Sequence, residues 1–556
     1  MKLKSNFLKI AIAGVLLGSS ANALADTSFV VEIDNPSLKD TASWVTGYRQ
    51  LSSDYAKVTV KDEDASFAEN FFYDNGYVFS EDIKFSKPRQ ESESRDYGSV
   101  VTQQSESLND PLLGGQTSLL DSTYKILDGM LYKRETNKTP VVLLLDSGSL
   151  PHEDVVFSGG YNYADTYLDP NRDPADYSDL TTIINDDGSI FDTCYDGHGI
   201  NMAGIISASK DNKVGIAGIS SSKMYMARVL EKDCATGESR SNLSNIIEAL
   251  SDANNASNKM GAPSFDVVNM SLAAKGVCTE PLQKVINDLY DAGTVVVTSV
   301  GNQGELASAY TPGNCENVIN VGAIDEGSYP SYGNTGSEVD ILAPSYNLTT
   351  TTENRYENII GTSGAAAVVT GMVALIKEQF PNATPEEVSK VLEISSNPLD
   401  FDFCGDGCGS GSVNLKEAIV AAEKIIDPKI TFSHAFGDSG QCLVVREAEA
   451  LSSQFNVCGA MVGKVNSSYV EEEEPVVYEL EVMKRPLGVT NWTSSRVQKI
   501  YDYSPTMNQD ELPIQDADFS QYDYGISSCY ISPAGEKFCP YVEELESSEI
   551  VLPSGC

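Results

Sequence analysis

Apolar runs alternate with helix-like segments along the middle of the chain. From residue 141 onward the strand-like runs are VVLLLD, MYMARVL, FDVVNMSL, TVVVTSVGN, VINVGA and VDILAP. Helical patterns separate them, as in LSNIIEALSDAN and EPLQKVINDLYDAG. Continuous β-branched strands with helices between them are typical of a parallel sheet that is covered on both faces. We therefore predict an α/β domain with a doubly wound parallel sheet and right-handed crossovers.

Further helices follow the last predicted strands. The apolar run GTSGAAAVVTG begins at Gly361 and suits a core helix, since it is too short to cross a bilayer. In TPEEVSKVLEIS, Thr384 and Glu387 have the spacing of a capping box at a helix start. The last helix, NLKEAIVAAEKII, runs to about Ile426, and Pro428 marks a boundary. The central domain is therefore predicted to span residues 106–426.

The regions on either side of this domain have a different character. Residues 26–105 contain SFVVEID, AKVTV and YVFSEDIKF with polar spacers, which predicts a small α+β domain. Residues 427–556 contain short runs rich in tyrosine and valine that alternate with turns, which predicts a small β-rich domain.

The first 25 residues have the pattern of an export signal. MKLKSNFLK carries three lysines, IAIAGVLLG is a short apolar run, and Ala23 and Ala25 form an A-x-A cleavage pattern. The alternative, a membrane anchor, needs a longer apolar run than this one. We predict a signal peptide over residues 1–25, an extracellular or periplasmic location, and no stable membrane span.

The overall charge and the cysteines agree with export. The net charge is −42, which argues against nucleic acid as a partner because phosphates require a basic surface. There are eleven cysteines, and disulfides persist outside the cytosol. Consecutive pairing would give five bridges and leave Cys556 over, although sequence does not fix connectivity. Cys404 and Cys408 favour a disulfide over a metal site, because no second Cys/His pair nearby has zinc spacing.

Three residue types in one domain suggest nucleophilic catalysis. A serine such as Ser363 is a poor nucleophile unless a base removes its proton, and histidine is the usual base. Of the three histidines, His198 lies in DGHGINMAG, where flanking glycines let the backbone bring the imidazole close to another group. Asp146 ends a buried strand, where open α/β sheets place their sites, and there it can orient the imidazole.

The segments LLLDSGS, DGHGINMAG and GTSGAAAVVTG resemble the three signature segments of the subtilisin-like serine proteases, or subtilases. The resemblance covers roughly residues 106–426. It implies a seven-stranded parallel sheet and a triad of Asp146, His198 and Ser363. SVGNQG resembles the family segment that supplies an oxyanion donor, which implies that role for Asn302.

The resemblance also implies substrate-binding residues. VVNMSLAAKG is similar to the strand that pairs with extended substrate, which places Ser271, Leu272 and Ala273 along the wall of the S1 pocket. Tyr310 falls where the proteinase-K-like branch has a tyrosine at the base of S1. The resemblance therefore implies apolar or aromatic residues before the cleaved bond.

The chain departs from the family pattern at five positions near the signature segments. Ile200 and Asn201 stand in place of threonine and histidine. Gly364, Ala367 and Val368 stand in place of methionine, proline and histidine. None of these changes removes a triad residue or Asn302, but Gly364 and the missing proline are expected to loosen the turn beneath the nucleophile.

The leading region weakly resembles the subtilase propeptide, an intramolecular chaperone and inhibitor. The resemblance implies a zymogen whose own propeptide, residues 26–105, is a partner and inhibitor and is cut off in the polar stretch 89–110. The resemblance implies that no cofactor is required and that structural calcium is possible. Asp154 and the loop SASKDNKVG are candidates for binding it. We assign no metal ligands.

The expected function is a secreted serine endopeptidase that acts on protein or peptide substrates. The alternative is a secreted binding protein on an inactivated subtilase fold, whose mark would be the loss of a triad residue. An esterase of the α/β-hydrolase type is disfavoured, because it requires G-x-S-x-G and position 365 is alanine.

Overall fold

The computed structural model of the protein divides into two compact units, Met1–Asp82 and Ile83–Cys556. The predicted signal peptide lies outside the described residues. The residues that the structure describes are 26–33, 44–87, 91–93, 109–116, 138–164, 173–184, 190–325, 330–399, 407, 409–426, 433–436, 443–446, 456–457, 477–487, 493–501, 522–535, 537–538 and 543–545.

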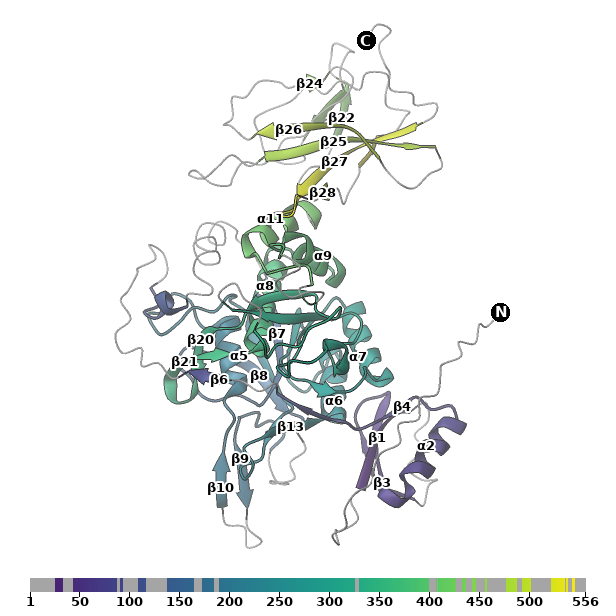
Figure 1. Ribbon diagram of the computed structural model, residues 1–556, viewed down its shortest axis with the longest axis vertical. Helices are drawn as coiled ribbons and strands as arrows, with labels where there is room; N and C mark the ends of the chain where they lie inside the picture. Colours follow the sequence, from purple (N-terminus) through teal and green to yellow (C-terminus); the bar gives the residue numbers. More distant parts are fainter. Residues whose placement is uncertain are drawn as a thin grey trace. The chain divides into compact units, whose positions relative to one another are not determined.

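The second unit is built on a seven-stranded, fully parallel sheet with the order β19-β18-β16-β14-β7-β11-β8 (Figure 1). This confirms the predicted α/β fold class. The strands are β7 (Val141–Asp146), β8 (Phe157–Asn162), β11 (Lys223–Arg228), β14 (Val267–Met270), β16 (Val295–Ser299), β18 (Ile319–Ile324) and β19 (Ile341–Pro344).

Both faces of this sheet are buried. Val142 and Leu144 of β7 belong to the core cluster formed with four helices. Leu143 and Leu145 are equally buried but lie outside that cluster, as the two-residue period of a strand requires. The four helices of the cluster are α5 (His198–Ser207), α8 (Thr362–Gln379), α9 (Pro385–Ser395) and α11 (Leu415–Ile425).

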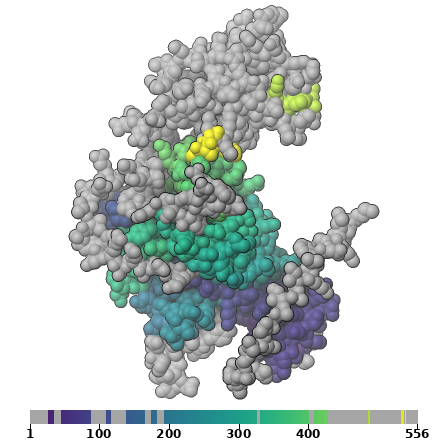
Figure 2. All heavy atoms as spheres, viewed as in Figure 1, coloured from purple at the N-terminus to yellow at the C-terminus, as the bar shows by residue number. Residues whose placement is uncertain are grey.

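The helices α6 (Leu243–Ala253) and α7 (Glu280–Asp291) pack against each other, and α7 also packs against β16. The sequence of α7 explains this contact, because Leu282, Val285, Ile286 and Leu289 recur with helical spacing and are all buried. In the space-filling view these central segments form a teal-to-green surface (Figure 2).

Helix α8 is buried on all sides from Thr362 to Lys377. Small residues make this burial feasible, because the helix must approach its neighbours closely. At Gly371, for example, an added Cβ would lie 2.7 Å from Cβ of Ile219. Helix α9 begins as predicted, with a capping box between Thr384 and Glu387.

Short strands of the second unit form four further small sheets. They form the groups β12-β13-β5, β20-β21-β6, β15-β17 and β9-β10. Their bounds are β5 (Lys84–Ser86), β6 (Glu91–Glu93), β9 (Thr181–Ile184), β10 (Ile190–Cys194), β12 (Glu231–Lys232), β13 (Ser239–Asn242), β15 (Ala274–Lys275), β17 (Tyr310–Thr311), β20 (Asn347–Thr351) and β21 (Arg355–Ile360), with short 3-10 turns at Leu113–Gly115, Ala307–Ala309 and Thr352–Asn354.

The first unit has its own α+β core. An antiparallel sheet of order β2-β3-β1-β4 carries Phe29 and Val58, which pack with Phe72 of helix α2. The elements are β1 (Asp26–Glu32), β2 (Val45–Gln50), β3 (Tyr55–Lys61), a 3-10 turn (Asp62–Asp64), α2 (Ala65–Asp74) and β4 (Phe79–Glu81).

The C-terminal region contains only antiparallel strands among its described residues, which agrees with the β-rich prediction. They are β22 (Ser433–Phe436), β23 (Leu443–Arg446), β24 (Asn456–Val457), β25 (Val477–Pro486), β26 (Thr493–Tyr501), β27 (Tyr522–Ile531), β28 (Lys537–Phe538) and β29 (Glu543–Leu545). Within the part of the chain that the structure describes, no helix combines the length and apolarity of a membrane span.

Two disulfides are present, Cys194–Cys234 and Cys278–Cys315. Both follow the consecutive pairing considered from the sequence. The side chains of the other cysteines, including Cys404, Cys408 and Cys556, lie outside the described residues.

The second disulfide is expected to stabilise the domain by closing a long loop. The double substitution Cys278→Ser and Cys315→Ser removes a link between residues 37 positions apart. We expect it to lower the free energy of unfolding by about 2–4 kcal/mol, because the unfolded chain gains conformational freedom. Urea denaturation of inactive protein measures this, with Ser389→Ala as an exposed control. An unchanged midpoint would show that the link is energetically neutral.

Candidate active site

The carboxyl edge of the parallel sheet brings Asp146 and His198 together. Asp146 is the last residue of β7 and His198 is the first residue of α5; both are buried. Nδ1 of His198 lies 2.8 and 2.9 Å from the two carboxylate oxygens of Asp146. A carboxylate only accepts hydrogen bonds, so this contact keeps the proton on Nδ1 and leaves Nε2 as the acceptor nitrogen of the neutral ring.

A glycine on each side of His198 permits this approach. Gly197 has φ of +84°, a conformation that glycine adopts without strain. A Cβ at Gly199 would lie 2.2 Å from the carbonyl oxygen of Gly148. The sequence DGHG therefore serves to seat the imidazole against the end of β7.

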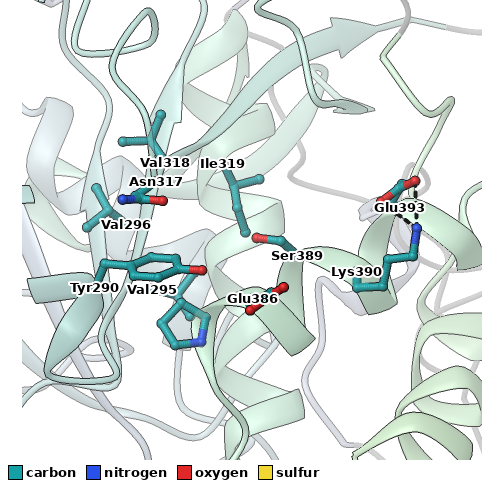
Figure 3. A pocket seen from close by; sticks show the side chains of 11 residues that line it. Tyr290, Val295, Val296, Asn317, Val318, Ile319, Glu386, Ser389, Lys390 and Glu393 are labelled. Atoms are coloured by element: carbon teal, nitrogen blue, oxygen red, sulfur yellow. Dashed lines mark hydrogen bonds and ion pairs between the residues drawn. The ribbon is translucent and has the colours of Figure 1, made fainter. Parts of the chain in front are cut away.

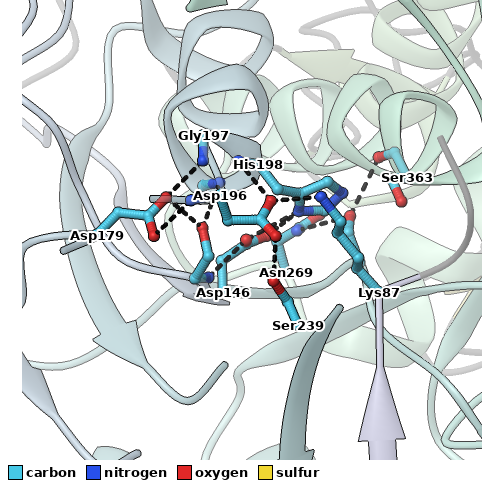
Figure 4. A network of polar contacts seen from close by, with 12 residues as sticks. Lys87, Asp146, Asp179, Asp196, Gly197, His198, Ser239, Asn269 and Ser363 are labelled. Carbon is cyan, nitrogen blue, oxygen red and sulfur yellow. Dashed lines mark hydrogen bonds and ion pairs between the residues drawn. The ribbon is translucent and has the colours of Figure 1, made fainter. Parts of the chain in front are cut away.

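Ser363 is the second residue of α8, which packs against α5. Figure 4 shows Ser363 and His198 in the same close-up of polar groups. Among the described residues, Oγ of Ser363 and Nε2 of His198 are both buried and have no hydrogen-bond partner. The backbone beneath the serine is held by Oγ of Ser271, which donates to the Ser363 carbonyl over 3.1 Å. The candidate nucleophile and the candidate base thus lie at the starts of two helices that pack against each other.

Asn302 lies three residues beyond β16, at the same edge of the sheet. Its Oδ1 accepts hydrogen bonds from the backbone N–H of Thr362 (3.0 Å) and from Oγ1 of Thr362 (2.8 Å). This pair of bonds turns the carbonyl end of the amide toward Thr362 and its Nδ2 end away from that residue. Thr362, which directly precedes Ser363, was not identified from the sequence.

The predicted substrate-binding residues lie beside this group. Ser271, Leu272 and Ala273 follow β14 and are buried. Tyr310 is also buried, and its hydroxyl donates to Glu305 over 3.1 Å. β17, which begins at Tyr310, pairs with β15, which directly follows Ala273, so the predicted wall residues and Tyr310 lie in or next to two paired strands.

Behind the histidine lies a pair of carboxylates that the sequence did not reveal. Asp179 accepts from the backbone N–H groups of Gly197 (2.6 Å) and Asp196 (3.1 Å) and from Oγ of Ser147 (2.9 Å). Burial and the neighbouring charge of Asp196 raise the pKa of Asp179 to about 7, despite these donors. For Asp196, burial acts to raise the pKa, but Lys87 and His198 outweigh it and lower the pKa overall.

The raised pKa of Asp179 predicts a pH dependence of stability. The folded protein binds a proton that the unfolded chain releases near pH 4, so this stabilisation is present below pH 4 and is lost as pH rises to about 7. We expect Asp179→Asn to flatten the fall in unfolding free energy between pH 5 and 8, by up to about 3 kcal/mol. Denaturation of the Ser363→Ala protein at several pH values, with Asp288→Asn as control, tests this. Parallel pH curves would contradict the assignment.

The departures from the family pattern are accommodated in the fold. Ile200 lies in the main core, and Nδ2 of Asn201 donates to the Thr350 carbonyl over 2.8 Å. A Cβ at Gly364 would lie 3.1 Å from Nδ2 of Asn347, so there is little space for a larger side chain. Ala367 is fully buried within the continuous helix α8. Looseness of the turn remains a prediction.

In the loop proposed for calcium, N–H groups of the protein donate hydrogen bonds to the carboxylate of Asp154. Oδ1 of Asp154 accepts from Nδ2 of Asn212 (2.8 Å), and Oδ2 accepts from the backbone N–H of Ile216 (2.9 Å). No group of three or more Asp, Glu, His or Cys side chains suited to a metal occurs within the described ranges. Both oxygens of Asp154 thus accept hydrogen bonds from N–H groups in or next to that loop. Structural calcium stays a prediction.

A separate cavity of about 370 Å³ lies at the other edge of the sheet (Figure 3). Val295 and Ile319, the first residues of β16 and β18, line it together with Tyr290 and Glu386. None of the candidate site residues contributes to it. The chemistry therefore lies at the carboxyl ends of the strands and not in this cavity, as is general for open α/β sheets.

A parallel α/β domain that gathers aspartate, histidine, serine and asparagine at the carboxyl ends of its strands has the architecture of subtilisin-like proteins. The model of the Subtilase family matches residues 137–416. The chain belongs to the subtilase family.

Individual proteins of known name are similar to parts of this chain. An extracellular protease of Xanthomonas campestris pv. campestris is 32% identical over 310 residues, 52% of this chain and 53% of that protein. Subtilisin DY of Bacillus licheniformis is 30% identical over 237 residues, 42% of this chain and 80% of that protein. A solved protease structure from Pseudoalteromonas arctica has a TM-score of 0.48 and 27% identity, and the match covers 57% of this chain and 99% of that one. The chain spans about half the length of the first relatives that it matches.

Proposed function

We propose that the protein is a secreted serine endopeptidase that is made as a self-processing zymogen. One observation carries the proposal. Nδ1 of His198 is bound to Asp146, while Nε2 of His198 and Oγ of Ser363 are buried at the starts of two packed helices without a described partner. Export is supported by the lysine-rich, apolar N-terminus and by relatives whose names include "extracellular".

The proposed reaction uses each group in turn. Oγ of Ser363 attacks the carbonyl carbon of the peptide bond, and Nε2 of His198 accepts the hydroxyl proton. Asp146 keeps the ring oriented and stabilises the imidazolium. Nδ2 of Asn302 donates to the oxyanion of the tetrahedral intermediate. His198 then protonates the leaving amine, and a water molecule, activated by the same ring, hydrolyses the acyl-enzyme and restores the serine.

The path of the leader supports self-processing. β5 pairs with β13 through Arg240 and Ser86, whereas β6 pairs with β21 through Ile360 and Glu91. β21 ends three residues before Ser363. β5 and β6 thus both pair with strands of the subtilase-like unit, and the partner of β6 ends close to the serine in the chain. We propose a cut between Ser86 and Glu91, at or just before the start of the polar stretch 89–110 predicted from the sequence.

The N-terminus of the secreted protein tests this proposal. We expect wild-type protein to begin between residues 87 and 91, and Ser363→Ala protein to retain the leader. Edman sequencing or intact mass spectrometry measures both. Identical trimming of the two proteins would show that another protease removes the leader and would contradict self-processing.

A further inference from the structure

Lys87 of the leader contacts the active-site domain next to the catalytic histidine. Its Nζ forms an ion pair with Oδ1 of Asp196, 109 residues further along the chain (Figure 4). The Asp196 side chain is completely buried, and the Lys87 side chain is 26% exposed. The backbone N–H of His198 donates to the same oxygen of Asp196 over 3.2 Å. Lys87 is therefore bound to a residue that lies two positions before His198 in the chain.

The strand that ends just before Lys87 is seated like an extended substrate. The backbone N–H of Ser86 donates to the carbonyl of Ala273 (3.0 Å), and the N–H of Ala273 donates back to the Ser86 carbonyl (2.9 Å). On its other edge, β5 pairs with β13. Phe85 is buried. The leader thus forms the middle strand between two segments of the domain, and its side chains mark the positions of substrate side chains.

The environment of Asp196 favours a cation. Oδ2 accepts a hydrogen bond from Oγ of Ser239, so the hydroxyl holds the carboxylate in place. Asp179, bonded to the Asp196 backbone, adds a second acidic group behind it. The nearby Arg240 of β13 pairs instead with Glu238. Leaving a buried charge without its partner costs free energy. Once the leader has left, a substrate cation that pairs with Asp196 therefore binds favourably.

We propose that Asp196, held by Ser239, forms a subsite that selects lysine or arginine in substrates. The selected substrate residue is the one that directly follows the residue paired with Ala273. We call this the Lys87 position. The inference rests on the proposed endopeptidase function and deepens it by naming a substrate class. A charge-assisted contact to a buried carboxylate discriminates strongly against a neutral side chain, by about 10- to 100-fold in kcat/KM.

Quenched fluorescent peptides based on the leader test the subsite. The peptides have the sequence Ile-Lys-Phe-Ser-X-Pro-Arg-Gln-Glu-Ser of residues 83–92, with X as lysine, arginine, norleucine or glutamate. Processed wild-type enzyme is expected to cleave the lysine and arginine peptides about 10- to 100-fold faster than the norleucine peptide. The glutamate peptide is expected to be slowest. Norleucine has nearly the shape of lysine without the charge, so the ratio isolates the ion pair from packing.

Variants of the subsite then assign the preference to Asp196. Asp196→Asn is expected to reduce the lysine-to-norleucine ratio to about 1–3, and Asp196→Glu to keep most of it. Asp288→Asn, which changes an exposed carboxylate on α7, is expected to leave the ratio unchanged. The ratio is informative even if the variant turns over slowly, because a general loss of structure lowers both rates together. If Asp196→Asn does not fold, Ser239→Ala provides a second test, with an expected loss of about 3-fold in the ratio.

The outcomes separate this inference from the proposed function. If wild-type enzyme cleaves the lysine and norleucine peptides equally well, the subsite is refuted and the protease stands. Labelling by a fluorophosphonate without cleavage of any peptide also refutes the subsite. Absence of both labelling and cleavage in folded, leader-free protein overturns the proposed function together with the subsite.

Discussion

Replacing Ser363 with alanine is expected to lower kcat/KM for peptide hydrolysis by at least about 10,000-fold while the protein stays folded. In the proposed mechanism, Oγ of Ser363 is the atom that forms the acyl-enzyme. The side chain makes no hydrogen bond among the described residues, so its removal costs little stability. Hydrolysis of the leader-based peptides, together with a urea melt, measures both effects.

The control for this substitution is Ser389→Ala, an exposed serine on α9 that lines the separate cavity. Its rate is expected to equal that of the wild type. Substantial activity in the Ser363→Ala protein would identify another nucleophile. A binding protein on an inactivated fold would instead show no hydrolysis in either protein.

Asn302→Ala is expected to lower kcat by about 100- to 1,000-fold with little change in KM. The two bonds from Thr362 fix Oδ1 of Asn302. In the proposed mechanism its Nδ2 donates to the oxyanion, which exists only after attack. An interaction made only in the transition state affects kcat and not substrate binding. Steady-state kinetics on the same peptides separate the two constants.

Thr362→Val refines this test. It removes the hydroxyl bond to Asn302 but keeps the backbone bond, so a smaller fall of about 10-fold is expected. Gln303→Ala, whose amide contacts Asn334 instead, serves as the neighbouring control. A rise in KM without a fall in kcat would show that Asn302 binds substrate and does not stabilise the oxyanion.

The parts of the fold that could be predicted are those with a strong local pattern. β7 is a continuous apolar run buried on both faces, and α8 is a helix of small residues that is buried all round. β8 was not predicted, because Gly159 and Gly160 conceal the strand pattern. A Cβ at Gly160 would lie 2.5 Å from the Met226 carbonyl, so packing against β11 requires glycine there. That requirement comes from tertiary contact and is not visible in the local sequence.

The residues of the candidate site also divide into those that a local sequence pattern reveals and those that only tertiary contacts reveal. Asp146, His198 and Ser363 could be found because each lies in a short segment with a family pattern. Lys87 and Asp196 could not, because 109 residues separate them and only the pairing of β5 with β13 brings them together. DGHG does contain Asp196, but its role depends on a residue from the leader. Long-range partners of this kind leave no spacing signal in one sequence.

Mapping the fluorophosphonate adduct on purified secreted protein tests the central claim most directly. Mass spectrometry of the intact protein and of its peptides identifies both the labelled residue and the first residue of the chain. The account predicts one adduct, on Ser363, in a chain that begins between residues 87 and 91. A folded protein that has lost its leader and carries no adduct on Ser363 would contradict it.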